Sequence, residues 1–403
     1  MTKSNESPHA NVQTTLQLLE GGNELFPDMV TSINNAKHSV QMETYIFDLT
    51  ASGATVATAL EQAATRGVHV RVMVDGFGTP TLPEAWMQRF KTAGVQLLIY
   101  EPIVTLGIFL PSQWRRLHRK LCVIDNEVAY CGGINVLDDW HDPSYGALTS
   151  PRFDFSVRVS GDIAKDIHHA TQALWERLSS KKPLVVRQVK TVIERLPQVL
   201  KRHHWQTHSH AGQVLAALVL RDNITNRGKI ERAYLKAIGD ARTEIIIANA
   251  YFVPGAKLRR ALVLAAKRGV KVQLLLQGKY EYFMQYHAAR PIYGALLAAG
   301  IEIYEYDKSY LHAKVAVIDS VWATVGSSNL DPLSLLLARE ANIVVQDAVF
   351  AQCLRLRLQT AMASEGKRVD THQMANRPWL QRLNEVIAFA VMRTGLWLFG
   401  KRY

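Results

Sequence analysis

The apolar residues of the chain follow a pattern of helix and strand segments that occurs twice. Residues 63–76, "AATRGVHVRVMVDG", and 265–278, "AAKRGVKVQLLLQG", each read as a helix end, a Gly turn and a mostly apolar strand. Residues 91–102 and 297–307 repeat a similar unit. Helices that alternate with Val-, Ile- and Leu-rich strands are typical of a sheet covered on both faces. The sequence therefore predicts an α/β fold of two similar lobes, each a mixed, mostly parallel sheet flanked by helices.

A polar pattern is duplicated as well. It reads His-x-Lys-x4-Asp and continues to Gly and Asn, which stand 14 and 17 positions after the histidine in both "LHRKLCVIDNEVAYCGGIN" and "LHAKVAVIDSVWATVGSSN". Side chains two positions apart on a strand share a face, so each His should project together with its Lys. An imidazole beside an ammonium is suited to attacking and holding a phosphate. The candidate residues are His118, Lys120, Asp125, Gly132 and Asn135 in the first copy, and His312, Lys314, Asp319, Gly326 and Asn329 in the second.

The repeat extends to both sides of this motif. Before it, "SVQMETYIF" matches "IIIANAYFV" and places Glu43 opposite Asn249. After it, "RFDFSVRVSG" matches "REANIVVQD", and an offset of one residue brings Asp154 opposite Glu340. A nucleophilic imidazole needs a carboxylate or carbonyl on its other nitrogen to fix the tautomer. Each half of the repeat therefore offers one carboxylate at this place.

The pattern HxK(x)4D(x)6G(x)2N resembles the mark of the phospholipase D superfamily, and the similarity runs from about Leu18 to Gln346. The wider sequence, including "IIIANAYFVPG" and "LHAKVAVIDSVWATVGSSNLDPLS", is similar to bacterial cardiolipin synthases of the B type, the kind without N-terminal membrane helices. The resemblance implies two lobes related by pseudo-twofold symmetry with the active site between them. It also implies transfer of a phosphatidyl group between two phosphatidylglycerols through a phosphohistidine, with release of glycerol.

The resemblance assigns roles to these residues. It places the carboxylate that orients a histidine at Glu340, and Asp154 is the counterpart in the first lobe. His118 is favoured as the nucleophile and His312 as the acid and base, although trapping the intermediate on His312 would reverse these roles. The lysines Lys120 and Lys314 would clamp the phosphate oxygens together with the amides of Asn135 and Asn329. No metal or other cofactor is then expected, because ammonium and amide groups take its place.

Two further sets of residues are less direct. Ser327 replaces Gly133 of the first copy, so we expect a hydroxyl contact to the phosphate in the second lobe only. Asp125 and Asp319 are grouped with the catalytic residues because they belong to the motif. We nevertheless expect both to support neighbouring loops rather than to touch phosphorus.

Charge and cysteine usage bound the possible partners. Lys and Arg exceed Asp and Glu by 12, which suits a polyanionic partner, either nucleic acid or an anionic membrane. Charge alone does not choose between them. The three cysteines, Cys122, Cys131 and Cys353, have neither metal-ligand spacing nor an even number, so we expect free thiols in a reducing cytoplasm.

The expected association with a membrane is peripheral. The N-terminus is polar and no long uncharged apolar stretch occurs, so neither a signal peptide nor a spanning helix is expected. The apolar segment 102–114 lies where the first half is 12 residues longer, and it is either a packing loop or a lip that dips into the bilayer. The expected division is a polar tail 1–16, a first lobe 17–180, a basic linker 181–213, a second lobe 214–365 and an amphipathic membrane-associating tail 366–403.

Several functions share these features. The leading hypothesis is a cardiolipin synthase on the cytoplasmic face of the bacterial inner membrane, with anionic phosphatidylglycerol and the membrane surface as its partners. It expects no nucleic acid and no obligatory protein partner. The alternatives are a phospholipase D that transfers to water or another alcohol, a superfamily nuclease, and a membrane-binding scaffold with a degenerate site. The apolar insertion and tail disfavour a nucleic-acid groove, and the two intact motifs disfavour a scaffold.

Overall fold

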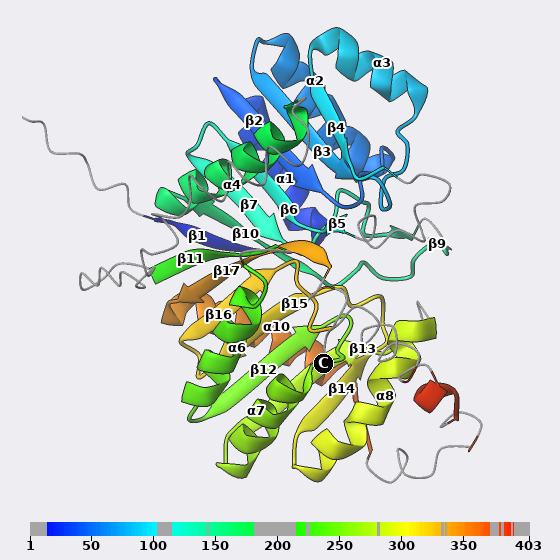
Figure 1. Ribbon diagram of the computed structural model, residues 1–403, viewed down its shortest axis with the longest axis vertical. Coiled ribbons are helices and arrows are strands. Elements are labelled where there is room, and N and C mark those ends of the chain that lie inside the picture. The colour runs from blue at the N-terminus through cyan, green and yellow to red at the C-terminus, as the bar shows by residue number, and fades with distance from the viewer. Residues whose placement is uncertain are drawn as a thin grey trace, which may run out of the picture.

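The structure is a computed structural model, and it describes residues 14–102, 115–142, 145–180, 215–222, 226–279, 283–331, 334, 337–370, 379, 383–387 and 390. The chain forms two lobes that meet along a central layer of strands (Figure 1). The predicted linker 181–213 and nearly all of the predicted lip 102–114 lie outside the described residues.

The first lobe is built on a seven-stranded sheet. Its strands, in spatial order, are β1 (Leu16–Glu20), β10 (Phe155–Ser160), β7 (Val128–Gly132), β6 (Lys120–Ile124), β2 (Ser39–Thr44), β3 (His69–Asp75) and β4 (Gln96–Tyr100). The helices are α1 (Gly21–Asn34), α2 (Ala51–Thr65), α3 (Glu84–Ala93) and α4 (Asp162–Ser179). A small hairpin of β8 (His141–Asp142) and β9 (Gly146–Ala147) follows the first motif.

The second lobe repeats this plan in a nine-stranded sheet. Its strands, in spatial order, are β11 (Leu215–Arg221), β17 (Ala338–Gln346), β16 (Trp322–Gly326), β15 (Lys314–Ile318), β12 (Glu244–Asn249), β13 (Lys271–Gln277), β14 (Glu302–Tyr306) and β18 (Gly366–Arg368), and β5 (Arg116–Leu117) of the first half joins β17. The helices are α6 (Lys229–Asp240), α7 (Ala256–Lys267), α8 (Phe283–Ala298) and α10 (Ala348–Glu365). Because β18 pairs with β14, this sheet continues past the predicted lobe boundary at residue 365.

Both sheets are mixed, as predicted, but the expectation that they are mostly parallel is wrong. In the first sheet only the pairs β2–β3 and β3–β4 are parallel, and the other four neighbouring pairs are antiparallel. The reason is that each motif strand turns back in a tight hairpin. Asp125 and Asn126 adopt positive φ angles of 51° and 60°, and Asp319 and Ser320 adopt 51° and 55°. Two consecutive left-handed residues form the kind of turn that joins antiparallel strands.

Each motif strand is buried on both faces, in a pattern that the two lobes share. In β6, Leu121 and Val123 pack in the core between the lobes, whereas Cys122 and Ile124 pack in the outer core of the first lobe. In β15, Val315 and Val317 take the first role, and Ala316 and Ile318 take the second. Alternate strand residues point to opposite faces, so the apolar run after each histidine holds its strand between two cores.

The lobes interlock through this shared core. Strands β7 and β10 contact β16 and β17, while α4 of the first lobe packs on β11 and α10 of the second packs on β1. The described helices include none with the length and hydropathy needed to cross a bilayer. The three cysteines are free, with Cys122 and Cys131 buried and Cys353 exposed. The motif residues therefore stand at a rigid junction that both lobes build.

Candidate active site

The backbone at each histidine is bonded to a strand of the opposite lobe. Strand β5 pairs in parallel with β17, so that Leu117 lies beside Arg339, and the His118 N–H donates to the Arg339 carbonyl at 3.0 Å. The second lobe repeats this exchange. Leu311 forms a parallel bridge with Phe153, and the His312 N–H donates to the Phe153 carbonyl at 2.9 Å. Each histidine is therefore placed by the chain of the other lobe.

The same exchange brings each histidine to a carboxylate. His118 Nδ1 lies 3.0 and 3.1 Å from the two oxygens of Glu340, and His312 Nδ1 lies 2.7 Å from Asp154 Oδ2. Nδ1 is occupied in both rings, so Nε2 is the nitrogen left to react, and the carboxylate fixes the tautomer. Sequence alignment had matched Asp154 with Glu340, but it did not reveal that each serves the histidine of the other lobe.

Strand register explains the offset that the alignment required. The Gly133 N–H donates to the Phe155 carbonyl at 2.9 Å, and the Ser327 N–H donates to the Ala341 carbonyl at 3.0 Å. The residues just before these two acceptors are Asp154 and Glu340, so the two carboxylates occupy equivalent positions. The offset arises because the preceding arginines of the two segments do not correspond in space.

Both motif lysines are buried beside their histidines. Lys120 Nζ donates to the His118 carbonyl at 2.8 Å, and Lys314 Nζ donates to the His312 carbonyl. Burial lowers the pKa of Lys120 to about 7, with Glu340 opposing this shift and Lys314 adding to it. The two ammonium groups repel each other, and such a pair can hold an anion because each gains from a negative charge placed between them.

The surroundings of both imidazoles favour the neutral form. Burial lowers the pKa of His118, although Glu340 partly counteracts it. The pKa of His312 lies well below its ordinary value, again mainly through burial, and Lys314 and Lys120 contribute. A neutral imidazole whose Nδ1 is held by a carboxylate has the protonation state that a nucleophile needs.

The motif asparagines follow the hairpins on both sides. Asn135 Oδ1 accepts the Ile46 N–H at 3.2 Å, which ties the amide to the end of β2. Asn329 is buried, and its Oδ1 finds no hydrogen-bond partner in the part of the chain that the structure describes. A buried amide that is not fully bonded retains polar capacity for a ligand.

The role expected of Ser327 needs correction. Its side chain is fully buried, and its hydroxyl donates to Glu340 Oε2 at 2.5 Å while accepting the Ala341 N–H at 3.0 Å. The hydroxyl therefore holds the orienting carboxylate and does not face a phosphate. A Cβ added at Gly133 would lie 2.3 Å from Asp154 Oδ1. The first copy therefore has Gly133 because Asp154 leaves no room for a side chain, whereas the second has room for Ser327 beside Glu340.

The motif aspartates lie at the turns. Asp125 accepts the backbone N–H groups of Lys37, His38 and Ser39 at 2.7–2.8 Å. Asp319 likewise accepts those of residues 242–244 and the Thr243 hydroxyl at 2.8–2.9 Å. Both aspartates join the motif hairpin to the start of a neighbouring strand, β2 or β12. Their place in the structure is that of supports, as their expected loop role required, and not that of groups touching phosphorus.

Sequence reasoning missed two features beside the first histidine. The Tyr45 ring meets the His118 ring edge-on at a centroid distance of 5.1 Å, and Lys120 Nζ lies 5.4 Å from the Tyr45 ring. The repeat offered a signal, because Tyr251 stands at the matching position. Arg119, between the motif His and Lys, forms two 2.7 Å hydrogen bonds to buried Glu43. The repeat showed that Glu43 has Asn249 at its matching position, but it did not show that Glu43 pairs with Arg119.

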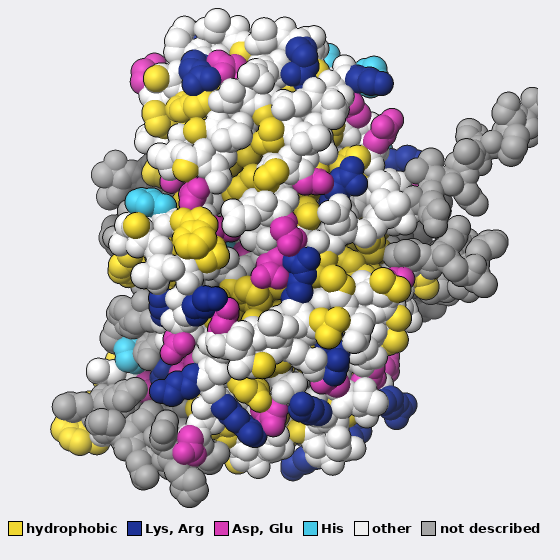
Figure 2. Space-filling view, turned by 180° about the vertical axis from the view of Figure 1, so that it is seen from behind, with side chains coloured by type: hydrophobic (Ala, Val, Ile, Leu, Met, Phe, Trp, Pro, Cys, Tyr) yellow, Lys and Arg dark blue, Asp and Glu magenta, His cyan; other side chains and the backbone are white. Residues whose placement is uncertain are grey.

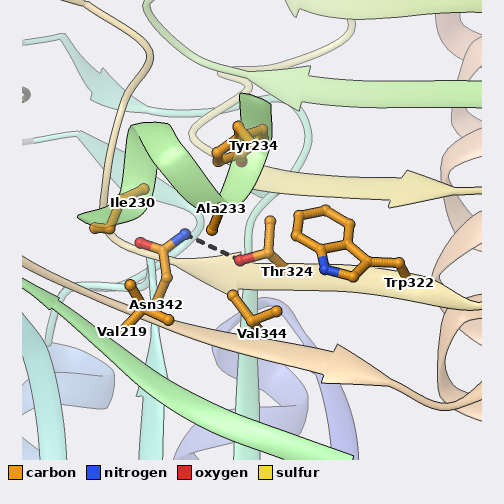
Figure 3. A pocket seen from close by; sticks show the side chains of 8 residues that line it. All are labelled: Val219, Ile230, Ala233, Tyr234, Trp322, Thr324, Asn342 and Val344. Atoms are coloured by element: carbon orange, nitrogen blue, oxygen red, sulfur yellow. Dashed lines mark hydrogen bonds between the residues drawn. The ribbon is translucent and has the colours of Figure 1, made fainter. Parts of the chain in front are cut away.

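A separate crevice lies inside the second lobe. It lies between α6 and strands β11, β16 and β17 and is too narrow to hold a water molecule (Figure 3). Asn342 Nδ2 donates to Thr324 Oγ1 at 3.2 Å there, and no charged side chain lines it. Among the described residues, no group of three or more His, Cys, Asp or Glu side chains is placed to hold a metal ion. The catalytic candidates are therefore the two histidine–carboxylate pairs.

Comparison with known proteins agrees with this geometry. A family model described as "Cardiolipin synthase, PLD-like domain" matches residues 29–142 and 234–361, one stretch in each lobe. The chain is 39% identical over 379 residues to cardiolipin synthase B of Salmonella typhimurium, which covers 94% of this chain and 87% of the relative. It is 37% identical to cardiolipin synthase B of Escherichia coli over the same shares. The chain belongs to the cardiolipin synthase family of phospholipase D-like enzymes.

A solved structure supports the fold assignment. Phosphatidylserine synthase of Haemophilus influenzae superposes with a TM-score of 0.67 at 11% identity, covering 94% of this chain and 97% of that one. The two-lobed phospholipase D-like fold and the enzymatic character expected from the sequence are thus confirmed. In this cardiolipin synthase family member, replacing a motif aspartate tests whether its hydrogen bonds to the neighbouring backbone stabilise the fold.

We expect Asp319→Ala to lower the free energy of unfolding by about 2 kcal/mol at pH 7, because three backbone donors lose their acceptor. Burial opposes the shift, but these donors hold the pKa of Asp319 below its ordinary value. A lowered pKa means that the stabilisation is present above the unfolded pKa and is lost as pH falls through the folded one. The difference from wild type should therefore shrink as pH falls below about 4.

Urea unfolding followed by circular dichroism at several pH values measures this difference. Exposed Asp307→Ala is the control and should change little. Equal losses for the two variants, or an Asp319→Ala loss that does not depend on pH, would contradict the assigned support.

Proposed function

We propose that the protein is a cardiolipin synthase that transfers a phosphatidyl group from one phosphatidylglycerol to another and releases glycerol. The observation that carries the proposal is the pair of partly buried histidines, each fixed through Nδ1 by a carboxylate of the opposite lobe and each accompanied by a buried lysine. Family membership supports the same reaction class.

The reaction proceeds in two displacements at one phosphorus. In the first, His118 Nε2 forms a bond to phosphorus, the bond to the glycerol oxygen breaks, and the Asp154–His312 pair gives that oxygen a proton. In the second, the hydroxyl of the incoming phosphatidylglycerol gives its proton to His312, its oxygen bonds to phosphorus, and the bond to His118 breaks. Both histidines then return to their starting states, and the products are cardiolipin and glycerol.

The protonation of the second pair supports this division of roles. Burial raises the pKa of Asp154 to about 7, against the opposing effect of Lys314. Near neutral pH the Asp154–His312 pair therefore retains a proton that it can pass to the leaving alkoxide. The first half-reaction needs a histidine that is free to attack, and both half-reactions need a histidine that moves a proton.

The phosphate oxygens are held by Lys120 and Lys314, with the amides of Asn135 and Asn329 at the rim. A phosphodiester anion between the two lysines favours their charged forms and reverses the effect of burial on the pKa of Lys120. These groups stabilise the negative charge that grows on the nonbridging oxygens, which is the largest single contribution in many transfer reactions. The roles assigned to these residues need no metal or other cofactor.

The substrate is reached from a membrane surface. Trp379, Leu383, Val386 and Ile387 are 71%, 46%, 58% and 48% exposed, although Glu385 among them is buried. Their spacing gives one helical face, and an exposed apolar face of this kind suits the interface of a bilayer. On the face shown in Figure 2, Lys and Arg side chains are spread over both lobes among acidic ones. We propose peripheral attachment to anionic lipid on the cytoplasmic face of the inner membrane, without nucleic acid or an obligatory protein partner.

Incubation with phosphatidylglycerol vesicles should yield cardiolipin and an equal amount of glycerol. His118→Ala and His312→Ala should each lower the rate by at least about 10³-fold, because each removes a group that both half-reactions need. The exposed His69→Ala is the matched control and should keep the wild-type rate. Mass spectrometry of the lipids measures the outcome. Phosphatidic acid alone would indicate a hydrolase, and the absence of any lipid product would favour the nuclease.

The covalent intermediate should be found on His118. Alkaline quenching preserves a phosphorus–nitrogen bond, so peptide mass spectrometry during turnover should detect the phosphatidyl adduct on the peptide with His118. The same adduct on His312 would reverse the two roles, and its absence from both peptides during active turnover would argue for direct transfer.

The apolar face of the C-terminal segment should contribute to vesicle binding. Replacing Leu383, Val386 and Ile387 by Asp should weaken binding to phosphatidylglycerol vesicles at least tenfold, since apolar burial and attraction to anionic lipid are both reduced. The control replaces three exposed apolar residues on α7 and α10, namely Leu264, Val349 and Leu356, by Asp. Cosedimentation measures both variants. Equal weakening would show that only net charge matters.

A further inference from the structure

The residues opposite the two orienting carboxylates differ, although the carboxylates are equivalent. In the second lobe, β11 pairs with β17 so that Arg221 stands directly across from Glu340. In the first lobe, β1 pairs with β10 so that Glu20 stands across from Phe155, and the next residue, Gly21, donates its N–H to the Asp154 carbonyl at 2.9 Å. Arg221 in the second lobe thus corresponds to Gly21 in the first. Glu340 has an arginine across from it, and Asp154 has a glycine.

Arg221 is buried at the register position opposite Glu340. Its side chain is 1% exposed, and one guanidinium nitrogen donates to the Ala338 carbonyl, two residues before Glu340. Its Nε and Nη2 have no hydrogen-bond partner among the described residues. Burial lowers the pKa of Arg221 to about 10, and Glu340 is the neighbour that opposes this most. Directly opposed residues of antiparallel strands lie about 5 Å apart at Cβ, and the charges of Arg221 and Glu340 interact across the sheet.

A carboxylate takes the corresponding place beside Asp154. Asp139 is 6% exposed, and its Oδ2 accepts the N–H of Gly22 at the start of α1. A Cβ added at Gly21 would lie 3.0 Å from the same oxygen, so Asp139 occupies the space that an arginine at position 21 would need. The charge of Asp139 raises the pKa of Asp154 further, in addition to the larger effect of burial.

Of the other charged groups near the two pairs, some act on both, whereas Arg152 acts on the His312 side and the Arg119–Glu43 ion pair adjoins His118. Lys120 and Lys314 lower the pKa of both histidines, and His118 lowers that of His312. Arg152 acts on His312 and on Asp139, which opposes the effect of Asp139 on that side. Asp138 acts on Asp139, and around Arg221 the further charges are Asp222, Arg227 and Arg339. Arg221 and Asp139 are the charged groups placed at one pair and not at the other by the strand register.

We propose that Arg221 and Asp139 are positioning residues of opposite charge that make the two histidine–carboxylate pairs inequivalent. Arg221 places a positive charge across the sheet from Glu340 and so disfavours a proton on the His118–Glu340 pair, while Asp139 places a negative charge near Asp154 and so favours a proton on the Asp154–His312 pair. The proposal deepens the proposed function, on which it rests for the names nucleophile and proton carrier. It assigns the choice between the two roles to residues outside both copies of the motif.

The test is the titration of each histidine in Arg221→Met and Asp139→Asn, followed by ¹⁵N NMR of the full chain labelled at histidine. His118→Gln and His312→Gln assign the two signals by their loss. Removal of a positive charge should raise the apparent pKa of the His118–Glu340 pair, and removal of a negative charge should lower that of the Asp154–His312 pair, each by about one unit. In the pH–rate profile, the acid limb should move to higher pH in Arg221→Met. The alkaline limb should move to lower pH in Asp139→Asn.

The controls separate charge from packing. Arg268→Met removes another arginine that donates to backbone carbonyls, those of Ile238, Gly239 and Ala241, and should leave both titrations unchanged. Arg221→Lys keeps the charge and should titrate as the wild type does, and it serves if Arg221→Met does not fold. A Lys variant that shifts its titration, or an Asp139→Asn variant that leaves the second pair unchanged, would overturn the proposal.

The titrations are measured without substrate, so their outcome is independent of the proposed function. Opposite shifts in a protein that forms no cardiolipin would refute the reaction and retain the inference. Cardiolipin formation with unchanged titrations would do the reverse.

Discussion

The site depends on the exchange of backbone hydrogen bonds between the lobes. Each motif histidine follows a short segment that pairs with the carboxylate-bearing strand of the other lobe, through the bonds from His118 to Arg339 and from His312 to Phe153. A backbone bond fixes position far better than a pair of long side chains could. The carboxylate one residue beyond each acceptor is then necessarily beside the imidazole. A single lobe contains a histidine and a carboxylate, but the two do not belong to the same pair.

This arrangement makes the core between the lobes a part of the catalytic apparatus. The residues three and five positions after each histidine, Leu121 and Val123 in one lobe and Val315 and Val317 in the other, pack in that core. A change in their packing would move one histidine relative to a carboxylate fixed in the opposite lobe. Catalytic groups need to be held to a fraction of an ångström, so the apolar run of the motif serves geometry as well as stability.

The sequence was sufficient for the repeat and the motif, because duplication at fixed offsets reveals equivalence directly, and the family resemblance indicated the orienting carboxylates. It could not reveal which histidine each carboxylate serves, since equivalence under a twofold axis is compatible with pairing inside a lobe or across it. The turn residues Asp125 and Asn126 could have indicated a hairpin, and overlooking them led to the expectation of mostly parallel sheets. Ser327 was misjudged because a Gly-to-Ser difference shows that a hydroxyl is present but not which carboxylate it contacts.

A twofold arrangement of identical motifs poses a chemical problem for the proposed reaction, which needs two different histidines. In that reaction one histidine attacks phosphorus unprotonated while the other carries a proton to a leaving group. Since the motifs themselves match, the difference has to come from residues around them. The two lobes differ most where buried charge is concentrated: Arg119 and Glu43 form an ion pair where the second lobe has Ala313 and Asn249. A buried charge acts strongly on its neighbours because little water screens it, so a few such substitutions suffice to give equivalent histidines unequal roles.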